Sequence, residues 1–181
     1  MRYASIRSLD ISNGEGVGVS LFVQGCDRHC FNCFNSETWD FNGGKEWTEE
    51  TKNKFMELID RPYIKRISIL GGEPLAEQNL DEVLSLIKQI RISFPEKTIW
   101  LYTGYNFDLL KLEYNEYKLY AANPTISPVR WEIISNVDVL VDGEYIDEQK
   151  DLSLKFRGSK NQRVIDVKQS LAQNKVILYC D

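Results

Sequence analysis

The sequence predicts an α/β fold in which short apolar strands alternate with amphipathic helices. β-rich apolar segments recur along the chain, helical segments with one apolar face lie between them, and several strands end at a glycine. Such alternation produces βαβ units and a mainly parallel sheet. The 181 residues are fewer than the about 250 of a full eight-unit barrel. We therefore expect a partial, open β/α barrel, formed by a single domain over residues 1–181.

The first strand is expected over residues 16–25 (GVGVSLFVQG), which are apolar and end at a glycine directly before Cys26. A helix is predicted over residues 47–60. Thr48 can cap its first turn, and the two glutamates that follow suit the positive end of the helix dipole.

A second strand is predicted over residues 64–74 (IKRISILGGEP), where it runs into a double-glycine turn. The helix expected over residues 78–94 is amphipathic. Its apolar face consists of Leu80, Val83, Leu84, Ile87, Ile90 and Phe94.

Residues 97–105 (KTIWLYTGY) predict a third strand, which again ends near a glycine. The region 106–136 has a weaker pattern. A short helix is expected around residues 109–112, and the prolines of NPTISP (123–128) should interrupt regular structure.

A fourth strand is predicted over residues 136–145 (NVDVLVDGEY) and has the same ending, a glycine after an acidic residue. Residues 162–167 (QRVIDV) and 175–180 (KVILYC) are two further short β candidates.

The ends of four predicted strands carry the residues most suited to a site. In parallel sheets, working residues collect just past the carboxyl ends of the strands. Cys26, Gly71–Glu73, Gly104 and Asp142–Gly143 all occupy such positions. We therefore expect these segments to face one site.

Composition excludes several classes of function. A net charge of −5 and a pI of about 5.1 argue against a nucleic-acid or polyanion binder. No apolar run approaches the about 18 residues that cross a bilayer, so no membrane association is expected. The N-terminus has no apolar signal region, which predicts a cytoplasmic protein. In that reducing compartment, clustered cysteines indicate metal binding or catalysis rather than disulfides.

Cys26, Cys30 and Cys33 lie within eight residues, in VQGCDRHCFNCFN (23–35). One interpretation is a structural zinc with His29 or Cys180 as fourth ligand. However, His29 is adjacent to Cys30, and structural zinc sites usually divide their ligands into two separated pairs. The C-x3-C-x2-C spacing favours a four-iron cluster with one iron left open for a small molecule.

The segment ILGGEP (69–74) adds a second signal. Glycines let the backbone approach a ligand closely. A carboxylate such as that of Glu73 can receive a protonated amine. Alone, the segment could equally be a plain turn with a solvated glutamate.

Together, CDRHCFNC and GGEP resemble the radical S-adenosylmethionine (SAM) enzymes. The resemblance implies that Cys26, Cys30 and Cys33 bind a 4Fe-4S cluster whose fourth iron is chelated by the methionyl group of SAM. It also implies that Gly71, Gly72 and Glu73 meet the methionyl amine.

By the same resemblance, Asn32, Cys33 and Phe34 lie along the adenosyl part. The sequence departs from the pattern at one position, because many members carry an aromatic residue directly before the third cysteine. Here Asn32 occupies it, with Phe31 and Phe34 nearby, so the residue that contacts adenine is left open.

Four longer segments are similar to the activating proteins of anaerobic ribonucleoside-triphosphate reductase: SNGEGVGVSLFVQGC, WLYTGY, DVLVDGEY and FRGSKNQRVIDV. The similarity implies that a reduced cluster cleaves SAM and that the resulting radical takes a hydrogen atom from a glycine of the large reductase subunit. It also implies a flavodoxin or ferredoxin as electron donor, and a homodimer. An activase of the pyruvate formate-lyase type, or a non-catalytic metal-binding module, remains as the alternative.

Other polar residues receive weaker expectations. Asp142 could meet SAM or a nearby cation, although a solvated turn residue explains it equally well. Arg157, Lys160 and Arg163 form either a solvated loop or a contact with SAM or the reductase. Cys180 is expected to be a bystander thiol, and His29 a loop residue. Residues that could line the cavity from the third strand are Tyr102, Thr103 and Tyr105.

Overall fold

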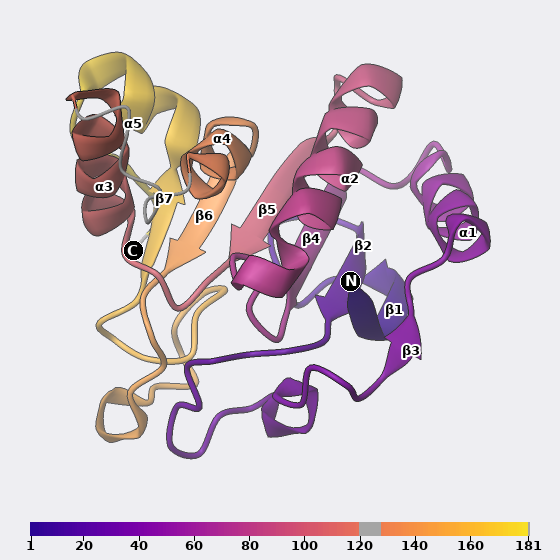
Figure 1. The fold of residues 1–181 in the computed structure, drawn as a ribbon, viewed down its shortest axis with the longest axis horizontal. Coiled ribbons are helices and arrows are strands. Elements are labelled where there is room, and N and C mark those ends of the chain that lie inside the picture. Colours follow the sequence, from indigo (N-terminus) through magenta and orange to yellow (C-terminus); the bar gives the residue numbers. More distant parts are fainter. Residues whose placement is uncertain (120–127, 181) are drawn as a thin grey trace.

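The computed structural model describes residues 1–119 and 128–180, and this part of the chain has an α/β fold (Figure 1). Its strands form one eight-stranded sheet in the order β3-β1-β2-β4-β5-β6-β7-β8. The α/β class predicted from the sequence is therefore confirmed. The strands are β1 (Arg2–Asp10), β2 (Gly18–Val23), β3 (Lys45–Glu46), β4 (Arg66–Gly71), β5 (Thr98–Tyr102), β6 (Val139–Asp142), β7 (Arg163–Asp166) and β8 (Leu178–Cys180).

Only the centre of the sheet is parallel. Strands β2, β4, β5 and β6 pair in parallel, whereas β1, β3, β7 and β8 pair antiparallel. The prediction of a mainly parallel sheet thus holds for the four central strands and is wrong for the edges. Parallel pairing requires a crossover of about a dozen residues or more, usually helical. The loop from β1 to β2 is too short for that, and β7 follows β6 without an α-helix between them.

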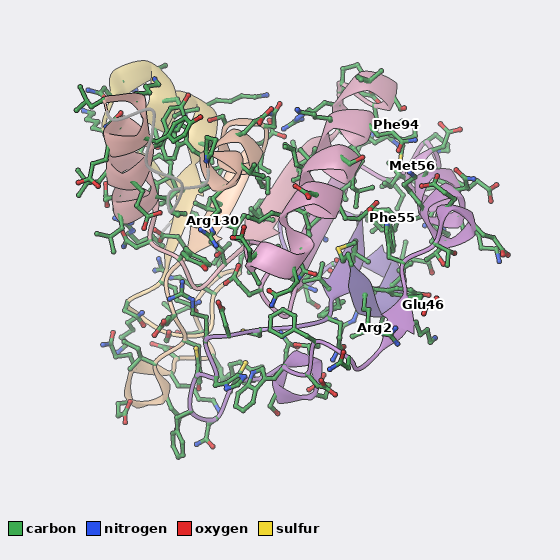
Figure 2. The ribbon with its side chains drawn as sticks, in the orientation of Figure 1. Arg2, Glu46, Phe55, Met56, Phe94 and Arg130 are labelled. Atoms are coloured by element: carbon green, nitrogen blue, oxygen red, sulfur yellow. The ribbon has the colours of Figure 1, made fainter. Side chains whose placement is uncertain are left out.

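Strands β1 and β3 were not predicted. Most of β1 is exposed or half-buried, so its sequence lacks the apolar run that marks the central strands. Figure 2 shows Arg2 of β1 beside Glu46 of β3 at this edge, and the two side chains form an ion pair of 3.7 Å. The pairing therefore depends on contacts that the local sequence pattern does not reveal.

The described residues contain α1 (Glu49–Ile59), α2 (Leu80–Ser93), α3 (Phe107–Leu119), α4 (Val129–Ser135) and α5 (Val167–Gln173). Thr48 caps α1 as expected, because its side chain accepts a hydrogen bond from the amide of Thr51. The helix expected around residues 109–112 is longer than predicted and corresponds to α3. Helix α4 was not predicted, and residues 123–127 of the NPTISP segment lie outside the described residues.

The helices cover one face of the sheet, and the main core lies beneath them (Figure 1). Leu21, Ile69, Leu101 and Leu140 are in register across the four central strands and point into this core. Figure 2 labels Phe55 of α1, which is fully buried in the same core. Burying one such side chain stabilises the fold by about 1.5–3 kcal/mol. The neighbouring residues along each strand necessarily point to the other face.

A buried ion pair holds the N-terminal loop against that other face. Arg66 of β4 is fully buried, and its Nη2 lies 3.2 Å from Oδ1 of Asp10. Arg66 also donates to the carbonyl oxygen of Asn13. Gly14 is required beside it, because a Cβ there would lie 2.5 Å from Cδ of Arg66 and the residue has φ +129°. The loop between β1 and β2 is therefore fixed over the sheet. In the part of the chain described here, no helix is long and apolar enough to cross a membrane.

Candidate functional site

A cavity of about 530 Å³ opens at the carboxyl ends of the four parallel strands, on the face that the helices leave uncovered. Its floor is formed by one side chain from each strand: Phe22, Leu70, Tyr102 and Val141. In Figure 1 the arrowheads of β5 and β6 point toward the segments that surround it, residues 26–44 and 143–162. Its volume lies within the usual range for small-molecule sites.

The three predicted cysteines lie on one compact loop that begins directly after β2. The loop is closed at its base, because the amide of Cys26 donates to the carbonyl oxygen of Trp39 at 3.0 Å. His29 and Asn32 adopt left-handed backbone conformations, with φ of 48° and 54°, and turn the chain between the cysteines. Cys30 and Cys33 line the cavity, whereas Cys26 is buried behind them. Among the described residues, no three His, Cys, Asp or Glu side chains are already arranged around a metal position.

Backbone amides lie near all three cysteine sulfurs. Burial raises the pKa of the Cys26 thiol to about 11, although the nearby amides of Arg28 and His29 act to lower it. Burial also raises the pKa of Cys30, although the nearby amide of Tyr145 acts to lower it. The amide of Asn35 lies 3.4 Å from Sγ of Cys33. Amide donors around thiolates are typical of iron–sulfur sites, and three soft sulfur ligands suit such a cluster. The loop therefore fits a 4Fe-4S cluster.

The double glycine joins the end of β4 to the base of the cysteine loop. The amide of Gly72 donates to Val23 at 2.9 Å, and the amide of Glu73 donates to Gly25 at 2.7 Å. A Cβ on Gly72 would lie only 2.4 Å from the carbonyl oxygen of Gly25. Gly71 has φ +105° and touches the backbone of Phe22. Both glycines line the cavity, so the expected close approach of backbone to ligand is sterically possible.

Glu73 lies at the predicted strand end, but its carboxylate points into the protein. Oε1 accepts hydrogen bonds from the amide of Leu75 and the hydroxyl of Thr103, both at 2.8 Å. Oε2 accepts from the amide of Gly104 at 2.8 Å. Burial raises the pKa of Glu73 to about 7. The side chain therefore fixes the end of β5 against the end of β4 and is not among the residues that line the cavity.

Asp142 is also buried, and it does not line the cavity. Its carboxylate accepts two hydrogen bonds from Arg163, of 3.0 and 2.5 Å, and one from the amide of Phe107 at 2.9 Å. Arg163 continues to Asp108 at 2.9 Å. These contacts tie β6 to β7 and to the start of α3. Asp142 and Arg163 together thus support the wall of the cavity.

Replacing Arg163 with alanine is expected to lower the free energy of unfolding by about 3–5 kcal/mol, because the carboxylate of Asp142 would remain buried without its charged partner. Denaturant titration measures the change. Lys160→Ala is the matched control, since the Lys160–Asp151 pair is exposed and 3.7 Å long; its loss should cost less than about 1 kcal/mol. An equal, small effect for both variants would contradict the supporting role of Arg163.

The segment around the third cysteine explains the unusual Asn32. This residue is in the left-handed region, which asparagine tolerates better than an aromatic residue. Its side-chain amide donates to Asp147 at 2.9 Å rather than lining the cavity. Phe31 is exposed, whereas Phe34 lines the cavity. Phe34 is therefore the aromatic residue placed where a purine ring could stack.

Several cavity residues had not been singled out from the sequence. Arg28 lies between two of the cysteines, and its guanidinium stacks on Tyr105 at 3.8 Å. Arg130, which does not itself line the cavity, makes a second contact with that ring from α4 at 5.0 Å, and Figure 2 shows its position on that helix. Arg7 and Asn13 approach from the N-terminal segment. The arginine inside the cysteine motif was a usable signal, whereas nothing in the local sequence marks the others.

The remaining predicted residues divide between the cavity and the surrounding protein. Tyr102, Thr103, Gly104, Gly143 and Arg157 line the cavity, whereas Tyr105 and Lys160 do not. His29 stacks on Trp39 at 4.7 Å, which agrees with its expected role as a loop residue. Cys180 lies on β8 beside the cluster of Trp100 and Val164, away from the cavity lining.

The chain is similar in sequence to a known domain family and to several known proteins. Residues 12–165 match the family model of the 4Fe-4S single cluster domain. The chain is 36% identical over 166 residues to the anaerobic ribonucleoside-triphosphate reductase-activating protein of Escherichia coli strain K12 and to that of Salmonella typhi, in each case over 91% of this chain and 97% of the relative. The protein of that name from Enterobacteria phage T4 is also 36% identical, over 91% of this chain and 93% of its own.

Proposed function

Because the chain belongs to the family of anaerobic ribonucleoside-triphosphate reductase-activating proteins and to the 4Fe-4S single cluster domains, we propose that it is a radical SAM activase. It reductively cleaves SAM and generates the glycyl radical of an anaerobic ribonucleoside-triphosphate reductase. One observation carries the proposal: the cysteine loop and the Gly71–Gly72 segment border the same cavity and are hydrogen-bonded to each other at their bases. A pyruvate formate-lyase-type activase is disfavoured by the names of these relatives.

Cys26, Cys30 and Cys33 would hold the cluster, which when bound supplies a low-potential electron and an iron position open to SAM. The backbone amides around the three sulfurs orient them and compensate their negative charge. The helix-free face of the sheet leaves the cavity open to a macromolecular substrate, as an open barrel of the radical SAM type would. The proposal treats residues 1–181 as one such domain.

The walls of the cavity would position SAM. The backbone at Gly71 and Gly72 can approach the methionyl group, and the ring of Phe34 can stack on adenine. Three arginines that line the cavity, Arg7, Arg28 and Arg157, supply positive charge for anionic groups. Direct contacts of Glu73, Asn32 and Asp142 with SAM stay predictions. Their hydrogen bonds within the protein favour a supporting role for each.

The proposal includes partners by inference from the family. The large subunit of the reductase would present its glycine at the mouth of the cavity. A flavodoxin or ferredoxin would deliver the electron, and the active form would be a homodimer. A protein with such thiols requires a reducing compartment, which the cytoplasm provides.

EPR spectroscopy under anaerobic conditions tests the proposed function. After reconstitution and reduction with dithionite, we expect a 4Fe-4S signal that changes shape when SAM is added, followed by equal amounts of methionine and 5′-deoxyadenosine. Adding the reductase should then produce a glycyl radical signal. Stoichiometric zinc in the protein, or a cluster signal that ignores SAM, would overturn the proposal.

A further inference from the structure

A second loop reaches the cysteine loop from the far side of the cavity. Residues 144–150 follow β6, whereas the cysteine loop follows β2, and the two meet at several points. The contacts are the ion pair Arg28–Glu144 (3.0 Å), the hydrogen bond Asn32–Asp147 (2.9 Å), the ring contact Phe34–Tyr145 (5.1 Å) and the cation–π contact of Lys150 with Phe34 (5.0 Å). The cysteine loop is therefore held at both its base and its tip.

Asp147 lies at the centre of this contact. Its Oδ2 accepts the hydrogen bond from the side chain of Asn32, and its Oδ1 accepts one from the hydroxyl of Tyr145 at 2.6 Å. The backbone amide of Tyr145 in turn faces the thiol of Cys30. A single carboxylate thus holds both the residue before Cys33 and the residue whose amide faces Cys30.

The left-handed backbone conformation of Asn32 limits which residue types can make the contact with Asp147. With φ +54°, the residue turns its side chain toward Asp147 at a position where few residue types are unstrained. Asparagine combines this tolerance with an amide donor. The residue type and its partner are therefore matched, and either change alone would break the contact.

We propose that Asp147 is a positioning residue of the cluster site, which acts through Asn32 and Tyr145 to hold the cysteine loop and the amide that faces the sulfur of Cys30. The inference rests on the proposed function, because it assigns the cluster to the three cysteines. Hydrogen bonds to cluster sulfurs tune the reduction potential. By placing positive amide hydrogens beside the sulfurs, they favour the reduced, more negative form. Outer contacts that orient metal ligands are worth about 10–100-fold in affinity.

The first test uses the cluster-free protein. We expect Cys30 in Asp147→Ala to react several-fold faster with iodoacetamide than in the wild type, because freeing the loop tip exposes its half-buried sulfur and this gain in access outweighs the smaller thiolate fraction left without the amide donor. Mass spectrometry of the peptides follows the reaction, with Cys180 as internal reference. Glu148→Ala is the matched control. It removes the same charge one residue away, and in the described structure its carboxylate makes no hydrogen bond or ion pair. Equal Cys30 reactivity in the two variants would overturn the proposal.

The second test uses the reconstituted protein. Removing an acidic side chain near the cluster would by itself raise the reduction potential of the cluster. We nevertheless expect Asp147→Ala to lower this potential, because the interaction of the Tyr145 amide with Cys30 is lost. A chelator should remove iron about tenfold faster than from the wild type. Glu148→Ala should show neither change. A potential in Asp147→Ala that equals or exceeds that of Glu148→Ala contradicts the positioning role.

A reversed pair distinguishes positioning from folding. Asn32→Asp would place two carboxylates in contact and should mimic Asp147→Ala. The double variant Asn32→Asp/Asp147→Asn restores a hydrogen bond with donor and acceptor exchanged, and should recover the wild-type potential. Failure of the double variant to recover counts against the inference alone. A wild-type protein that binds no cluster overturns the proposed function, while the alkylation test still decides whether Asp147 holds Cys30.

Discussion

Alanine at Cys26, Cys30 or Cys33 is expected to reduce the formation of 5′-deoxyadenosine to the uncatalysed background, because the remaining two thiolates cannot hold a cluster with one open iron. The measurement is product formation in the reconstituted, dithionite-reduced protein, together with its iron content and EPR spectrum. The loss should be the same for each position, since the three thiolates act as one unit.

Cys180→Ala is the matched control for these variants. This cysteine packs beside Trp100 and is not among the residues that line the cavity, so cluster content and SAM cleavage should stay at wild-type levels. Thermal unfolding of the cluster-free proteins separates loss of cluster from loss of fold. A Cys30→Ala protein that still forms 5′-deoxyadenosine at the wild-type rate would place the cluster elsewhere.

Replacing Glu73 with alanine is expected to destabilise the protein by about 3 kcal/mol or more. The amides of Leu75 and Gly104 and the hydroxyl of Thr103 would lose their common acceptor in a buried site. Each buried donor left without a partner costs about 1–3 kcal/mol. Chemical denaturation of the cluster-free protein measures the loss without interference from SAM or iron.

The pH dependence of stability tests the same carboxyl group. Burial raises the pKa of Glu73 from 4.5 to about 7, so between these values the folded protein binds the proton more tightly than the unfolded chain. The contribution of this group to the free energy of unfolding is therefore complete below pH 4.5 and is lost as the pH rises through 7. The slope is at most about 1.4 kcal/mol per pH unit. Glu73→Gln should lack it, and an unchanged slope in that variant would contradict the assignment.

The sequence predicted the central strands well, because residues such as Ile69 and Leu101 belong to apolar runs that are buried on both faces of the sheet. It did not predict β1, whose exposed and half-buried residues lack this signal. Helix α4 also escaped prediction, since it begins directly after the break at Pro128. Strand β7 pairs antiparallel with β6 because no α-helix crosses over between them. The sequence pattern did not reveal this connection.

The residues of the candidate site were likewise predicted only in part. The spacing of Cys26, Cys30 and Cys33 predicted one loop, and the structure shows it. Glu73 and Asp142 lie at the predicted strand ends, but the direction of their side chains depends on donors from other segments, such as Gly104 and Arg163. Asp147 had no detectable signal, because its role arises from a contact with a residue 115 positions away.

The sheet ends in very short strands, two residues in β3 and three in β8. Strand β3 pairs only with Arg2 and Tyr3, so the rest of β1 forms the actual edge on that side of the sheet. The irregular register of β1 against β2 and the exposed charge of Arg7 are the features that discourage edge-to-edge addition there.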